Sequence, residues 1–181
     1  GDQICRNAGI KKVTMELGAN CPLIVMSDAD IEKVAAATVA SGFANAGQVC
    51  ISTQRVFADR NIYADFLDAL KAPTDAFLAG NPMDETIKMG PMIRETDAIR
   101  VGSWISEAVD QGARIIAGGD RDGTLHAPTV VADVRSDMRM SREELFGPAV
   151  AVSSFDNIDD AIAMANDSRF GLSAGIFTQN V

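Results

Sequence analysis

The chain has 181 residues, of which 47% are hydrophobic and 23% charged, as expected of a globular protein that buries a substantial core. Its formal net charge is -9 and no block of basic residues occurs, which argues against nucleic acid or an anionic membrane as a partner. Residues 34–54 carry no charge, but their hydroxyl and amide side chains predict a buried element of a soluble domain rather than a membrane span.

The three cysteines, Cys5, Cys21 and Cys50, form no CxxC pair, and their odd number does not suggest a disulfide framework. With a single histidine in the chain, no metal site of the zinc type is expected. These features and the lack of a signal peptide favour a reducing, cytoplasmic location. The sequence starts at Gly1 without Met and stops at Val181 after a strand-like run, so we expect a domain, residues 1–181, that is truncated at both ends.

Short β-rich runs alternate along the chain with amphipathic runs of helical period. In chain order they predict strands at 12–17 and 23–26, a helix that starts at a capping Ser27 and reaches 42, and a strand at 55–58. They then predict a helix at 62–79 with a break at Pro73, a loop at 81–91, a helix at 95–111, strands at 114–117, 128–132 and 147–155, a helix from 157 to 165 and a strand at 173–177. This alternation predicts an α/β fold, an open, largely parallel twisted sheet with helices on both faces.

Glu16 closes the predicted strand at 12–17. In open α/β sheets the functional crevice lies at the carboxyl ends of the strands, so Glu16 is expected to face that crevice. Burial there would raise its pKa towards the range that suits a general base. A solvated strand end is the simpler interpretation of a lone carboxylate.

Cys50 lies in "NAGQVCIS", residues 45–52, directly after a glycine-bearing break between a predicted helix and a predicted strand. The missing side chain of Gly47 would let a substrate or cofactor approach the backbone, and free N–H groups at the transition would bind an anion. Both features favour a reactive thiol, whereas a packed thiol is the commoner fate of a lone cysteine. The spacing alone leaves both interpretations open.

Two further groups are candidates for chemistry. His126 is the only histidine and a cysteine-protease dyad would have to use it, although its place before a strand favours a surface or strand-entry residue. In "EELFGP", residues 143–148, a carboxylate can accept from two neighbouring hydroxyls, as on a ribose, but a charged loop is the simpler interpretation. No GxGxxG or Walker pattern occurs, so these residues encode no dinucleotide phosphate site.

Six motifs occur in a fixed order, namely "MELGANCP" (15–22), "FANAGQVCISTQRV" (43–56), "GPMI" (90–93), "PTVV" (128–131), "EELFGPAV" (143–150) and "FGLSAGIFTQ" (170–179). Together they resemble the NAD(P)-dependent aldehyde dehydrogenase superfamily over essentially the whole chain. The resemblance implies the catalytic domain of an enzyme that oxidises a small-molecule aldehyde to a carboxylic acid with NAD or NADP, and a homo-oligomer in full length. It also implies that a Gly-rich cofactor loop and an oxyanion-hole asparagine lie upstream, so we expect this chain alone to be inactive as a dehydrogenase.

The resemblance implies a role for each matching residue. Cys50 is the nucleophile that forms a thiohemiacetal and then a thioester, and its backbone N–H is half of the oxyanion hole. Glu16 is the general base that activates the hydrolytic water. The implied contacts to the nicotinamide and its ribose are Glu144, Phe146, Leu17 and Gly18.

Two other functions stay open at this point. CoA-acylating semialdehyde dehydrogenases commonly lack a glutamate at the position of Glu16, so its presence favours hydrolysis over transfer to CoA. A non-catalytic scaffold derived from the fold is disfavoured by the intact Cys50 and Glu16. The common "ELGGK" is here "ELGAN", with Ala19 and Asn20, which bears on subfamily and does not name the aldehyde.

Overall fold

The computed structural model describes residues 1–180. Its centre is a six-stranded sheet in the order β3-β6-β7-β2-β1-β8, in which the edge strand β3 is antiparallel to β6 and the other pairs are parallel. The strands are β3 (Arg114–Ala117), β6 (Thr129–Ala132), β7 (Ala149–Phe155), β2 (Thr53–Asp59), β1 (Cys21–Val25) and β8 (Gly175–Phe177), and a separate hairpin pairs β4 (Arg121–Asp122) with β5 (Leu125–His126). The predicted α/β class and largely parallel sheet are confirmed.

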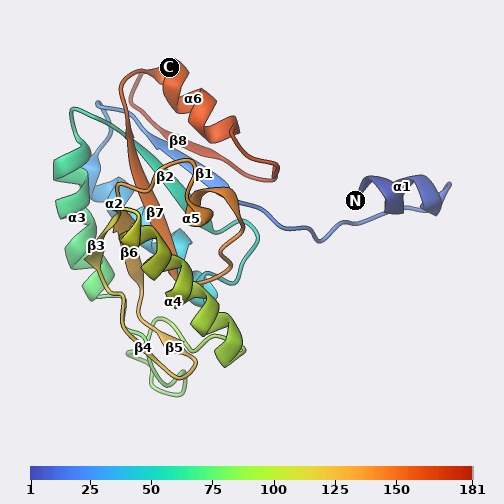
Figure 1. Cartoon of the computed structure of the whole chain (residues 1–181), viewed down its shortest axis with the longest axis horizontal. Helices are drawn as coiled ribbons and strands as arrows, with labels where there is room; N and C mark the ends of the chain where they lie inside the picture. Colours follow the sequence, from blue (N-terminus) through green and yellow to red (C-terminus); the bar gives the residue numbers. More distant parts are fainter. Residues whose placement is uncertain (181) are drawn as a thin grey trace.

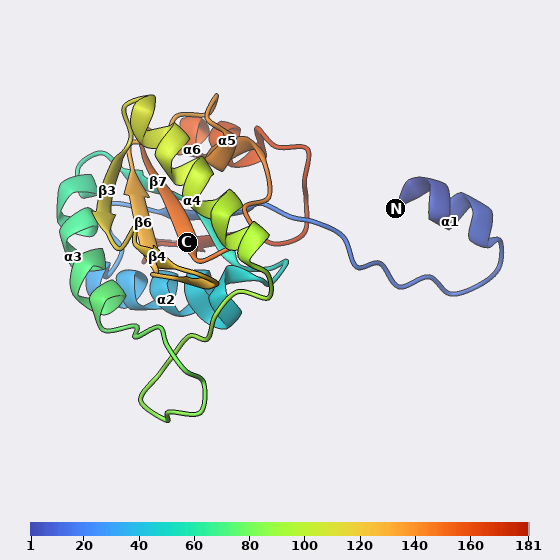
Figure 2. The same ribbon diagram turned by 60° about the horizontal axis from the view of Figure 1, so that its bottom comes forward.

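Helices cover both faces of the sheet, as predicted (Figures 1 and 2). One face carries α2 (Ile31–Phe43) and α3 (Tyr63–Asp75), and the other carries α4 (Glu95–Asp110), α5 (Arg139–Arg142) and α6 (Ile158–Asn166). The 3₁₀ turn η1 (Ala44–Gly47) follows α2, and α1 (Asp2–Ala8) stands apart from the body with no buried residue. Within the described part of the chain, no helix is long and apolar enough to cross a membrane.

The buried core fixes the sheet as a rigid base for the loops around it. A large apolar cluster joins β1, β2, β6 and β7 to α2, α3 and α4, and a small one seats α6 through Ile24, Phe57, Phe155 and Ala161. Burial of these side chains is the main force that holds the layers together. Because β1, β2 and β7 are parallel neighbours, the three segments that lead into their amino ends lie side by side at one edge of the sheet.

Residues 12–17, predicted as a strand, have no regular secondary structure and are mostly exposed. Strand β1 already has β2 and β8 as its neighbours, and residues 12–17 pair with neither edge strand of the sheet, β3 or β8. A β-rich composition describes side chains that suit a half-buried pleated surface, and such a surface is missing here. The segment instead runs extended from α1 to the body (Figure 1).

Three helix details also differ from expectation. The N-cap of α2 is Asp30 and not Ser27, with the Asp30 carboxylate accepting the backbone N–H of Lys33 at 3.2 Å. Helix α3 runs through Pro73 without a break and ends at Asp75. In α6 the expected apolar face is buried at Ala161 and packs partly at Ala165, while Ile158 and Ile162 are 37% and 48% exposed.

His126, expected at the surface or at a strand entry, is only 1% exposed and belongs to β5. Its Nδ1 lies 2.9 Å from the carbonyl oxygen of Ala127, and its Nε2 has no hydrogen-bond partner among residues 1–180. Burial lowers the pKa of His126 from its ordinary value of 6.5, with the Ala127 carbonyl opposing the shift. The imidazole is therefore neutral in the folded protein.

This burial predicts acid sensitivity of the fold. Below pH 6.5 the unfolded chain binds a proton that the folded chain excludes, so the free energy of unfolding falls, by at most about 1.4 kcal/mol per pH unit. Urea unfolding of the protein at pH 7.5 and pH 5.5 measures the loss. The His126→Gln variant has no imidazole to titrate, so its free energy of unfolding should fall less between these two pH values. An equal fall in both proteins would show that His126 is not the group responsible.

Candidate active site

Cys50 lies on the irregular segment that connects η1 to β2, directly before the amino end of β2. Its side chain is half-buried and its thiol is free. Within residues 1–180 the backbone N–H of Cys50 donates no hydrogen bond. A half-exposed sulfur beside a free N–H provides a nucleophile and a donor for a negatively charged oxygen.

The turn before Cys50 is tightly specified by its backbone. Asn45, Ala46 and Gly47 all have positive φ, and the Gln48 side chain locks the turn by donating to the Asn45 carbonyl at 3.1 Å and accepting the Ile93 N–H at 3.1 Å. A Cβ at Gly47 would lie 2.0 Å from the carbonyl oxygen of another backbone segment. The missing side chain of Gly47 therefore makes room for the backbone of Gly147. The expectation that it makes room for a substrate or cofactor is wrong.

Glu144 and Phe146 lie on the loop that leads into β7. Hydrogen bonds to Leu145 hold this loop from both sides, because its N–H donates to Gln54 Oε1 at 2.9 Å and its carbonyl accepts from Arg100 at 2.6 Å. Leu145 is buried in the core, whereas its neighbours Glu144 and Phe146 line the cavity. Phe146 adopts a positive φ and is 38% exposed.

The segment before β1 brings Glu16, Leu17 and Gly18 against this loop. Glu16 is exposed, which agrees with the interpretation as a solvated carboxylate, and Leu17 is also exposed. The carboxylate of Glu144 accepts the backbone N–H of Ala19 at 2.9 Å, and a Cβ at Gly18 would lie 2.6 Å from the other Glu144 oxygen. Residues 16–18 therefore owe their place to the Glu144 contact and not to a strand.

One cavity of about 420 Å³ brings these segments together, and it is lined by Glu16, Leu17, Gly18, Gln48, Val49, Cys50, Glu144 and Phe146. All six sequence-predicted site residues belong to that set. The cavity lies where the chain enters β1, β2 and β7, at the amino ends of these parallel strands. The expected position at the carboxyl ends is wrong, because residues 12–17 are not a strand and Glu16 precedes β1.

Cys21 provides a contrast to Cys50. It opens β1, is buried, and donates from its thiol to the carbonyl oxygen of Cys50 at a distance of 3.4 Å. Burial raises the pKa of the Cys21 thiol, with the nearby Cys50 adding to the shift. Cys21 therefore stays a protonated structural thiol that supports the backbone of Cys50.

Sequence reasoning missed the residues that build the cavity without carrying its chemistry. Gln48 lies in the motif at residues 43–56. Its polar side chain next to Gly47 was the feature of the sequence that could have indicated its role in the turn. The contact through Ala19 uses its backbone N–H and leaves no trace in side-chain patterns. His126, in contrast, lies outside the residues that line the cavity, so a cysteine–histidine dyad finds no support.

A family model described as "Aldehyde dehydrogenase family" matches residues 1–181. The chain belongs to the aldehyde dehydrogenase family. The 3-sulfolactaldehyde dehydrogenase of Priestia aryabhattai is 49% identical over 181 residues, which are 100% of this chain and 38% of that protein. The crystal structure of lactaldehyde dehydrogenase from Escherichia coli superposes with a TM-score of 0.90 at 41% identity, covering 99% of this chain and 39% of that one.

NAD(P) is the cofactor of aldehyde dehydrogenases with this fold. The structure of an NAD-dependent aldehyde dehydrogenase from Sinorhizobium meliloti matches with a TM-score of 0.92 at 36% identity, over 99% of this chain and 36% of that one. The chain therefore spans well under half the length of the aldehyde dehydrogenases that it matches.

Proposed function

We propose that residues 1–181 are the catalytic part of a longer aldehyde dehydrogenase that oxidises a small aldehyde to a carboxylic acid with NAD or NADP. The observation that carries this proposal is the shared cavity, which places a half-exposed thiol, a free backbone N–H and two glutamates around one space. Covalent oxidation through sulfur needs such a set, namely a nucleophile, an anion site and a separate base. The Gly-rich phosphate loop and the upstream asparagine are proposed to lie outside this chain.

Cys50 begins the proposed reaction. Its thiolate adds to the aldehyde carbon, and the carbonyl oxygen becomes an oxyanion beside the backbone N–H of Cys50. NAD(P)⁺, held by Glu144, Leu17, Gly18 and Phe146, would supply the hydride acceptor for that carbon, and loss of the hydride would leave the acyl group as a thioester on the Cys50 sulfur. Glu16 then takes a proton from water, the water oxygen attacks the thioester carbon, and the C–S bond breaks to release the carboxylic acid and free Cys50.

The cavity fits the nicotinamide and ribose end of the cofactor. One oxygen of Glu144 accepts from Ala19, which leaves the other oxygen beside Gly18 able to accept ribose hydroxyls. Gly18 keeps this approach open, because any side chain there would meet Glu144. The exposed apolar side chains of Leu17 and Phe146 offer surfaces for an aromatic ring.

The test of this function is product analysis with the protein that the complete reading frame encodes. Lactaldehyde, 3-sulfolactaldehyde and betaine aldehyde are each supplied with NAD⁺ or NADP⁺, with and without CoA. Reduction of the cofactor with release of free acid in the absence of CoA is expected. Activity that needs CoA and yields an acyl-CoA would establish the CoA-acylating alternative, and no reduction of either cofactor with any aldehyde would support a scaffold.

Replacing Glu144 with Gln tests the cofactor role of this residue. The amide keeps the shape but lacks the charge that orients two hydroxyls, so NAD(P)⁺ should bind more weakly and hydride transfer should become slower, by about 10-fold or more. A larger primary deuterium isotope effect with deuterated aldehyde is the expected result. An unchanged isotope effect together with an unchanged KM for the cofactor would leave Glu144 as an ordinary loop residue.

We also propose a cytoplasmic homo-oligomer, as family membership implies. Leu172 before β8, Ile176 in β8 and Ile162 in α6 are each about half exposed, and such apolar side chains are ones that a partner could cover. All three cysteines are free, in keeping with a reducing compartment. Light scattering of the complete protein gives its oligomeric state.

A further inference from the structure

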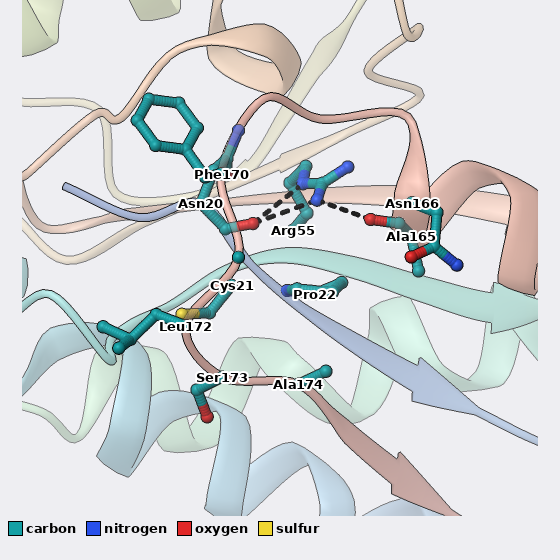
Figure 3. A pocket seen from close by; sticks show the side chains of 11 residues that line it. Asn20, Cys21, Pro22, Arg55, Ala165, Asn166, Phe170, Leu172, Ser173 and Ala174 are labelled. Atoms are coloured by element: carbon teal, nitrogen blue, oxygen red, sulfur yellow. Dashed lines mark hydrogen bonds between the residues drawn. The ribbon is translucent and has the colours of Figure 1, made fainter. Parts of the chain in front are cut away.

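Arg55, in β2, is a buried arginine without a carboxylate partner in the described part of the chain. It is 2% exposed, and its guanidinium donates only to backbone carbonyls, as Figure 3 shows for the carbonyls of Asn20 and Ala165. Its Nε and Nη2 reach the Asn20 carbonyl at 3.2 and 3.0 Å, Nη1 reaches that of Met164 at 3.0 Å, and Nη2 reaches that of Ala165 at 3.0 Å. A buried charge is costly unless it is compensated, so these carbonyls must hold it firmly.

Two of these carbonyls belong to the last turn of α6. Carbonyls at a helix C-terminus lack intrahelical partners and carry partial negative charge, and α6 has no basic residue of its own in that turn. Arg55 therefore caps α6 and uses the same guanidinium to bind the carbonyl of Asn20. It ties the segment before β1 to a helix packed in the core.

The segment that Arg55 holds is the one that contacts Glu144. One residue before Asn20, the backbone N–H of Ala19 donates to Glu144, and the Asn20 side chain donates to the Ser141 carbonyl at 2.7 Å. Gly18 packs against the remaining Glu144 oxygen. No helix or strand fixes residues 12–20 upstream, so the donor is anchored by Arg55, by the Asn20 side chain and by the β1 ladder.

We propose that Arg55 is a positioning residue for the cofactor site, which holds the Asn20 carbonyl and thereby fixes the Ala19 N–H that orients Glu144. This inference rests on the proposed role of Glu144. Arg55 itself does not line the Cys50 cavity and touches no reacting atom. A lysine cannot replace it, because a single ammonium cannot span the carbonyls of two segments as a planar fork does.

Arg55→Lys in the complete protein is the test, with Arg60→Lys as the matched control. Arg60 directly follows the carboxyl end of β2, and within residues 1–180 its side chain pairs only with the exposed Asp156. For Arg55→Lys we expect about 10-fold weaker NAD⁺ binding by calorimetric titration and faster amide hydrogen exchange at Ala19. Cofactor-free hydrolysis of p-nitrophenyl acetate, which uses Cys50 and Glu16 but no NAD(P)⁺, should stay within about twofold, as should every property of Arg60→Lys.

Two results would overturn the proposal. One is unchanged NAD⁺ affinity in Arg55→Lys, and the other is a parallel loss of ester hydrolysis and cofactor binding, which would make Arg55 purely structural. If the variant fails to fold, amide hydrogen exchange of the wild-type protein is the test, because fast exchange at Ala19 would contradict its hydrogen bond to Glu144. Wild-type protein that oxidises no aldehyde would instead refute the proposed function, independently of Arg55.

Discussion

Replacement of Cys50 by Ala is expected to remove aldehyde oxidation by the complete protein, by about 10⁴-fold or more. The alanine side chain can form neither the thiohemiacetal nor the thioester, so no later step of the reaction can begin. The turn that carries Cys50 is fixed by Gln48 and by the close approach of Gly47 to Gly147, so the fold and the cavity should persist. Initial rates of NAD(P)H formation measure the loss.

The control for this substitution is Cys5→Ser. Cys5 is exposed on α1, which stands apart from the sheet, and it does not line the cavity. Iodoacetamide labelling adds a second readout: wild type and Cys5→Ser should be inactivated in step with modification of Cys50. A Cys50→Ala protein that retains oxidation near the wild-type rate would exclude Cys50 as the nucleophile.

The alternation of strands and helices was predictable because each element is defined by its own apolar period. The run that became β7 and the face of α2 that packs on the sheet are both visible in the sequence, since burial selects these residues. Residues 12–17 show where this reasoning fails. Their composition suits a strand, but a strand also needs a partner strand beside it, and residues 12–17 lie outside the sheet.

The motifs predicted which residues belong to the site, but they did not predict how these residues are arranged in space. Cys50 and Glu144 lie 94 positions apart in the sequence, and parallel pairing in the order β7-β2-β1 brings their loops together. The contacts that complete the cavity are made by backbone groups, such as the Ala19 N–H, and by Arg55 from inside the sheet. Arg55 is one of two charged residues in β2, and its charge directly before the apolar residues Val56 and Phe57 was the signal in the sequence that pointed to it.

Replacement of Glu16 by Gln is expected to separate the two halves of the reaction. The amide keeps the shape of the side chain but cannot take a proton from water, so the thioester on Cys50 should form and then persist. Rapid mixing should show a burst of NAD(P)H close to one equivalent per site, followed by steady-state turnover about 10²–10³-fold below wild type. Glu16 is exposed and lines the same cavity as Cys50, so its position permits this role without a contribution to the core.

Glu85→Gln is the matched control, because Glu85 is exposed in the loop between α3 and α4 and does not line the cavity. Its burst and steady-state rates should equal those of wild type. Mass spectrometry of quenched Glu16→Gln protein should find the acyl group on the peptide that contains Cys50. A steady-state rate near wild type at neutral pH would assign the base to another group, whereas loss of the burst itself would place Glu16 before thioester formation, in the ionisation of Cys50.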